Sequence, residues 1–329
     1  KEQSVILYGC GFSFVALNWV DTSLEDYPLL YTFTYVVTAS GLAESPAADA
    51  QVGAMLTGVL LPMGAIAQNY SVTTSVYVTD GFGATSDAAT DLVRVKPLLQ
   101  SIESLANTSK VAIRSYLDSG EPEKALQALS ATSSNIATSK AVTNGGRRLQ
   151  SSMDATEVLR AQMLENTWES YQLTDITPSN VASLLSTLEG IIDDTTGIAL
   201  VTEESALHLL TTVMEATVTE SIGLSSAGAQ LVGTCLSFLL ESNLFNATNS
   251  NLEAAASNVS SITSCAATAL LYGSTAGVEQ ELSGSHLKLH ARREELRYLE
   301  RTVLGVHGST ARAELPKDIS SFMTLSGAP

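Results

Sequence analysis

The stretch Val-Thr-Thr-Ser-Val-Tyr-Val at residues 72–78 decides the fold of the first part of the chain, because branched and aromatic side chains alternate along it. This two-residue period predicts a β-strand. Leu30–Val37 alternates in the same way, and residues 91–95 form a third such run after a turn cluster at residues 80–83. Short strands separated by turns predict an antiparallel β-sandwich over residues 1–97.

After Pro97 the hydrophobic period becomes helical. Thr177 followed by Pro178 is typical of a helix start, and Val181, Leu184 and Leu188 then share one face. We therefore expect a bundle of about six or seven helices over residues 98–306. Residues 130–152 are rich in Ser, Thr, Asn and Gly, which predicts a flexible loop, and residues 307–329 an extended tail or the start of a further β part. The chain is predicted to be an α+β protein.

The charge balance excludes several kinds of partner. The chain has 17 Lys and Arg against 34 Asp and Glu, a net charge of −17, so its surface repels nucleic acid. The longest uncharged windows, residues 3–20 and 221–240, are interrupted by polar residues and do not read as membrane spans. Any membrane anchor is expected outside this chain.

Three cysteines exclude a disulfide-dense scaffold and a four-cysteine zinc site. Cys235 and Cys265 fall in one region and are the preferred disulfide pair, with two buried thiols as the alternative. Cys10 would then be the odd cysteine.

Metal sites are not expected. His286 and His290 are four residues apart on a predicted helix, but Leu287 stands where metalloprotease helices carry a glutamate, and no third ligand is evident. The basic and acidic residues of 288–301 predict a solvated face of that last helix, with docking of an acidic partner or a lipid surface as the alternative. Asp21, Asp80 and Asp87 offer oxygen ligands for calcium, although Asp80 is better explained as closing a turn.

No motif for catalysis is present. The run at residues 273–277 lacks the serine of a nucleophile elbow, and no phosphate-binding loop follows a strand. We therefore expect no enzyme activity and no cofactor. A hydrolase would need a deep polar pocket with a histidine, and only His208 lies in the middle of the predicted bundle.

Two kinds of modification site are candidates. The pair Arg147–Arg148 lies in the predicted loop and is a candidate processing site, with a solvated linker as the alternative. Four Asn-x-Ser/Thr sequons are candidate N-glycosylation sites, which would be used if the protein passes through a secretory pathway. They are Asn69, Asn107, Asn246 and Asn258.

Four blocks in the first part of the chain carry a family resemblance. They are Asn-Trp-Val-Asp at 18–21, Pro-Leu-Leu-Tyr-Thr-Phe at 28–33, Leu-Pro-Met-Gly at 61–64 and Val-Tyr-Val-Thr-Asp-Gly-Phe-Gly-Ala at 76–84. In this order and spacing they resemble the end of a REJ module, which is named for the receptor for egg jelly and occurs in polycystin-1-like surface proteins. The resemblance implies a sandwich of the Ig, fibronectin III or PKD type.

The resemblance also implies a helical part after the β module. In polycystin-1-like proteins a helical segment comes next, the first half of a GAIN domain, and Ala-Glu-Leu-Pro at 313–316 resembles the strand entry after it. The family cleaves itself between His-Leu and Ser or Thr, whereas His286-Leu287 is followed here by Lys288. We therefore expect no self-cleavage within this chain.

The resemblance implies a non-enzymatic extracellular segment of a polycystin-1-like membrane protein, acting in adhesion, ligand sensing or force sensing on the cell surface, including cilia or flagella. Its expected partners are proteins, such as a polycystin-2-like channel or an extracellular filament protein. The alternative is a structural subunit of an extracellular filament or coat, such as a flagellar surface appendage.

Overall fold

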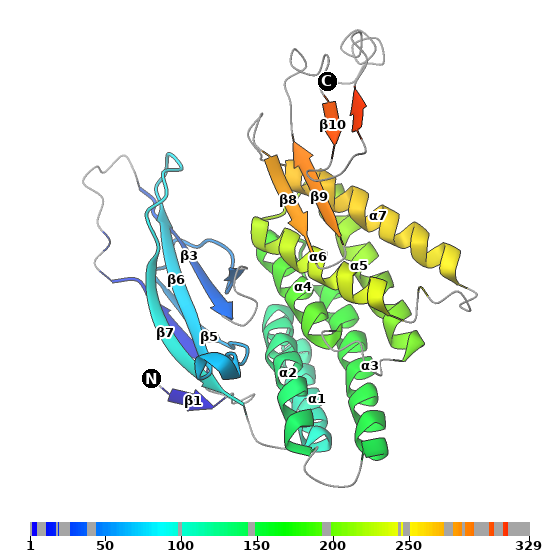
Figure 1. The fold of residues 1–329 in the computed structure, drawn as a ribbon. Helices are drawn as coiled ribbons and strands as arrows, with labels where there is room; N and C mark the ends of the chain where they lie inside the picture. The colour runs from blue at the N-terminus through cyan, green and yellow to red at the C-terminus, as the bar shows by residue number, and fades with distance from the viewer. Residues whose placement is uncertain are drawn as a thin grey trace.

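The computed structural model confirms an α+β fold, with antiparallel strands in sheets followed by helices (Figure 1). It describes residues 2–4, 11–17, 19, 27–37, 44–97, 101–143, 149–192, 199–242, 245, 251–272, 279–284, 287–292, 303–305 and 312–314. Figure 1 shows the sheet lying along one side of the helices.

The main sheet has five strands in the order β1-β7-β6-β3-β4. Its pairs are antiparallel except β1 with β7, which run parallel. The strands predicted near 30–37, 72–78 and 91–95 are confirmed as β3, β6 and β7. The bounds are β1 Glu2–Ser4, β3 Leu30–Val37, β4 Ser45–Pro46, β6 Ser71–Thr79 and β7 Ala89–Lys96.

A two-stranded ribbon of β2 (Phe12–Val15) and β5 (Met55–Val59) accompanies the main sheet. The rings of Phe14 on β2 and Phe33 on β3 have centroids 5.7 Å apart, and Phe33 is 1% exposed. The ribbon and the sheet therefore share one apolar core, which the alternating side chains of β3 and β6 build.

Seven helices lie within the described ranges, at the upper limit of the number expected. They bury one continuous apolar cluster, and serines cap two of them: Ser101 Oγ accepts from Ser104 N at 3.3 Å, and Ser225 Oγ from Gly228 N at 3.1 Å. None of them combines the length and hydropathy of a membrane span. Their bounds are α1 Ile102–Asp118, α2 Pro122–Thr143, α3 Leu149–Leu173, α4 Pro178–Ile192, α5 Leu200–Thr219, α6 Ser226–Glu241 and α7 Leu252–Leu271.

The prediction of a flexible loop over residues 130–152 was wrong for most of its length, because α2 continues to Thr143 and α3 begins at Leu149. The Ser and Thr hydroxyls of α2 donate hydrogen bonds to main-chain carbonyls of the preceding turn. These hydroxyls therefore have partners although the helix is buried. Thr132 Oγ1 donates to Ala128 O at 2.7 Å, and Ser133 Oγ to Ser130 O at 2.9 Å. Arg147 and Arg148 lie outside the described residues.

The prediction of a last helix over residues 288–301 was wrong for its first five residues. Lys288–Arg292 forms strand β9, which pairs antiparallel with β8 (Glu279–Ser283). Leu282 is buried opposite the half-buried Leu289, and Ala291 is also buried. Apolar residues two apart on this segment therefore face the helices, as a strand requires. A second hairpin pairs β10 (Val303–Gly305) with β11 (Arg312–Glu314).

Hydrogen bonds fasten the sheet layer to the helices. Gln127 on α2 accepts from Leu60 N and donates to Ala47 O, each at 3.1 Å. Ser134, also on α2, accepts from Met63 N at 3.0 Å. Side chains of α2 are thus the hydrogen-bond partners of main-chain groups in the strand connections. These bonds fix the position of the sheet relative to α2.

We expect Gln127→Ala to lower the free energy of unfolding by about 2 kcal/mol, since it removes two partly buried hydrogen bonds between the layers. Urea unfolding followed by both far-UV circular dichroism and tryptophan fluorescence measures this. Gln51→Ala is a matched control, because Gln51 also makes two side-chain hydrogen bonds, but to Gly53 and Met55 at an exposed site. Equal losses in the two variants would contradict the fastening role.

Candidate binding cleft

A cleft of about 540 Å³ lies where the end of the sheet meets three helices. Strands β3 and β4 contribute Tyr35 and Ser45, and the connection after β5 contributes residues 62–65. The other walls come from α2, α4 and α6. Pockets that bind small molecules usually have this size and often form between structural units. The cleft is therefore the candidate functional site.

Tyr35 forms the floor of the cleft and is buried. Its hydroxyl bonds with the side chains of Ser130, Ser45 and Ser186, and Ser130 Oγ lies 3.5 Å from Ser186 Oγ. Burial raises the pKa of Tyr35 above the 10.0 of a free tyrosine, although the serine hydroxyls act in the opposite direction. Neutral hydroxyl groups therefore surround the Tyr35 side chain at the floor.

Close packing of α2 on α4 forms one wall. A Cβ at Gly190 of α4 would lie 2.3 Å from Ser133 Oγ and 2.7 Å from Ser133 Cβ. Only glycine fits at this crossing, because real Cβ contacts are longer than this. Small residues on both helices bring their hydroxyl groups to the edge of the cleft.

The α6 wall carries polar groups that have no hydrogen-bond partner among the described residues. Gln230 and Thr234 line the cleft and are half-buried, and their side chains make no hydrogen bond within the described residues. Glu189 of α4 is the one charged side chain among the described lining residues. Its charge, together with burial as the larger cause, raises the pKa of the Cys235 thiol well above the usual range. The cleft therefore offers hydroxyl, amide and carboxylate groups to a ligand.

The sequence did not identify this cleft. Its lining comes from segments far apart in the chain, and the serines of α2 lie in a run whose composition predicts a loop. Helical spacing of Ser130, Ser133 and Ser134 was the available signal, since these residues share one face of a helix.

The predicted disulfide between Cys235 and Cys265 is not formed, and both thiols are free. Cys235 Sγ on α6 lies 3.8 Å from Leu185 O on α4. Cys265 on α7 instead has Ser261 and Glu215 as neighbours, and burial is the main cause that raises its pKa. The two side chains face different helices, which explains why nearness in sequence did not make them a pair.

Three of the four predicted sequons lie within the described residues. Asn69, in the turn before β6, and Asn107, on α1, are exposed, whereas Asn258 on α7 is half-buried. Asn246 lies outside the described residues. Exposure makes Asn69 and Asn107 the best-placed acceptors of a glycan, whose use stays a prediction.

The described residues contain no group of three side chains that could hold a metal ion. His286 and Asp21 lie outside these residues, and His290 is on strand β9 instead of a helix. Asp80 Oδ1 accepts from Phe82 N at 2.9 Å and from Ala84 N at 2.8 Å, so this carboxylate closes the turn after β6.

His208 lies in a small groove between α3 and α5, not in a deep pocket. Its exposed ring stacks on Trp168 with centroids 5.5 Å apart, and Ser205 nearby donates to Val201 O. Because the Ser205 hydroxyl donates to the backbone of its own helix, it does not donate to His208. Ser205 and His208 therefore do not form a pair of nucleophile and general base.

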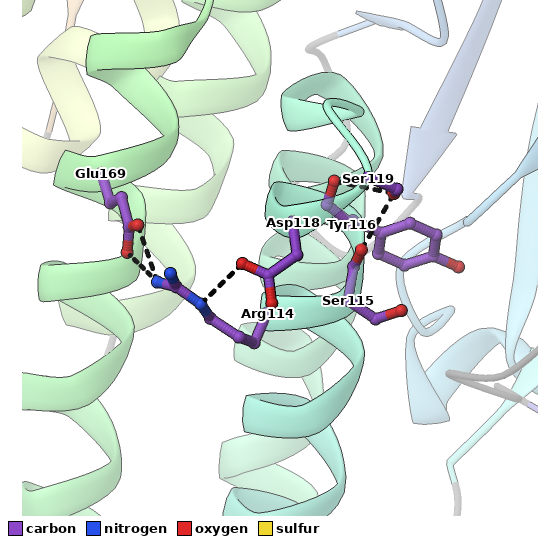
Figure 2. A network of polar contacts seen from close by, with 6 residues as sticks. All are labelled: Arg114, Ser115, Tyr116, Asp118, Ser119 and Glu169. Carbon is purple, nitrogen blue, oxygen red and sulfur yellow. Dashed lines mark hydrogen bonds and ion pairs between the residues drawn. The ribbon is translucent and has the colours of Figure 1, made fainter.

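Another polar network joins α1 to α3 (Figure 2). Arg114 Nη1 lies 2.7 Å from Glu169 Oε1, and Arg114 Nε lies 3.0 Å from Asp118 Oδ1. All three side chains are exposed, so both pairs contribute little stability, and of the two only Arg114–Glu169 connects α1 to α3.

The raised pKa of Tyr35 predicts a loss of stability at high pH. Because the folded pKa lies above 10.0, the protonated hydroxyl is favoured in the fold, and that stability is present below pH 10 and lost as the pH rises through the folded pKa. We expect Tyr35→Phe to cost about 1 kcal/mol at pH 7 and to weaken this decline. Unfolding free energies from pH 7 upward measure both effects. An identical alkaline decline in the variant would contradict the assignment.

Comparison with known proteins finds a family match in the first part of the chain. Residues 11–131 match the family model of the REJ domain, from β2 to the middle of α2. No curated protein and no solved structure matches the chain. The GAIN-like identity of the later helices and the boundary at residue 97 stay predictions. REJ domains are non-catalytic extracellular modules, so this match suggests a polycystin-1-like extracellular module and a surface location. The resemblance of the blocks between residues 18 and 84 to the REJ module is thereby confirmed, and the matched region extends from residue 11 to residue 131.

Proposed function

We propose that the chain is a non-enzymatic extracellular segment of a polycystin-1-like membrane protein, and that it bears load in adhesion or force sensing. The observation that carries this is the fastening of the sheet to the helices. Main-chain groups of Ala47, Leu60 and Met63 are bonded to side chains of α2. Pulling the sheet away would break these bonds and expose the apolar cluster beneath them.

Shared apolar packing supports the same role. Leu60, in the connection after β5, belongs to the apolar cluster of the helices, and Ala131 of α2 belongs to the cluster of the sheet. Ser179 at the start of α4 also bonds to Asp49, next to β4. A load entering the sheet would therefore pass into α2 and α4 and not into one flexible linker. The proposed partners are proteins, such as a polycystin-2-like channel or an extracellular filament protein.

Single-molecule pulling on the two ends of the chain tests the load-bearing role. We expect the sheet to unfold together with α2 and α4, in one event that releases far more chain than the sheet holds. Unfolding of residues 1–97 alone would release about 350 Å. A separate early event of this length, unchanged in Gln127→Ala, would contradict the proposal.

Glycosidase treatment of the protein from its own cells tests the surface location. We expect a loss of mass that is smaller in Asn107→Gln and in Asn69→Gln, because these two asparagines are exposed. Antibody labelling of unpermeabilised cells is the companion measurement. A protein that shows no mass loss and is labelled only after permeabilisation would contradict the proposed location.

A further inference from the structure

The cleft between sheet and helices has the size and chemistry of a ligand site. Its volume of about 540 Å³ is well above that of a single water molecule. Gln230 and Thr234 lie on its α6 wall, with their side-chain donors and acceptors unused within the described residues. A gap left by helix packing would not require polar groups at both positions, since an apolar side chain would stabilise such a wall better.

The charges of the lining decide the class of ligand. No Lys, Arg or His is among the described lining residues, and the one charged group is the carboxylate of Glu189. An anionic ligand would lose its water without gaining a cation and would be repelled by this carboxylate. The remaining polar groups are hydroxyls and an amide, which both donate and accept hydrogen bonds. Such a set matches a neutral ligand that also carries many hydroxyls.

Apolar side chains in the same cleft restrict the class of ligand further. Phe238 of α6, Val37 of β3 and Met63 line it beside the polar groups. A lining that mixes polar and apolar side chains fits a ring that has hydroxyls on its rim and C–H groups on its faces. Volume and lining together fit one or two hexose units.

We propose that the cleft binds a neutral polyhydroxylated ligand of the hexose or inositol class, with Gln230 and Thr234 donating and accepting hydrogen bonds at its rim. The ligand is either a free sugar or the terminal sugar of a glycan. Tyr35 and its serine partners form a fixed floor below the ligand. This site goes beyond the proposed load-bearing role, because a ligand can bind here whether or not the segment carries force.

Titration calorimetry and ligand-observed NMR on the full chain test the site, with glucose, galactose, mannose and myo-inositol as probes. We expect at least one of them to bind, and Gln230→Ala or Thr234→Val to weaken this binding about five- to tenfold each. The matched controls are Gln51→Ala and Thr212→Val, whose side chains bond elsewhere, and they should leave the affinity unchanged. Thermal melts establish that each variant is folded.

Two further arms complete the test. The methyl glycoside of the bound sugar distinguishes a glycan terminus, which it mimics, from a free sugar. The 6-sulfate of the same sugar tests neutrality, and we expect it to bind more weakly than the parent. The proposal is overturned if no neutral probe binds, if both α6 variants bind like the wild type, or if the sulfated sugar binds more tightly.

Discussion

Helix α2 is packed on two sides at once, and the rest of the structure depends on this double contact. Leu126 and Leu129 belong to the apolar cluster of the helices, while Ala131 belongs to that of the sheet. Gln127 and Ser134 bond to the main chain of the strand connections. Burial of apolar surface on both sides supplies the free energy, and the hydrogen bonds fix the register. The β module is therefore joined to the helical part through a helix that serves as core for both.

Close contact on both sides of α2 also explains its composition. A helix that lies between a sheet and other helices needs small side chains, and Ser133 packs so closely on α4 that Gly190 has no room for a Cβ. Serine and threonine meet this need because their hydroxyls bond to carbonyls of the preceding turn. The same small side chains leave room at the end of the sheet, where the hydroxyl-lined cleft opens. The close contact between the sheet and the helices and the presence of the cleft therefore both follow from the small Ser and Thr residues of α2.

The sequence predicted the features that depend on the spacing of apolar residues within one strand or helix. Strands β3 and β6 alternate clearly, and α4 begins where Thr177 and Pro178 indicate. Composition misled in α2, because Ser-rich segments are usually loops and the contacts that bury this one come from distant residues. Strand β9 was misassigned because spacing of charges by three and four outweighed the alternation of Leu289 and Ala291. The cleft needed the tertiary structure, since Tyr35, Ser186 and Thr234 come from three separate elements.

Native-state hydrogen exchange tests most directly whether the sheet and α2 are one cooperative unit. Amides of β3, β6, α2 and α4 would be followed at increasing denaturant concentration, where exchange reports the free energy of the opening that exposes each amide. We predict that these four elements share one opening with the same free energy and the same denaturant dependence. An opening of lower free energy that exposes β3 and β6 while α2 stays protected would contradict it.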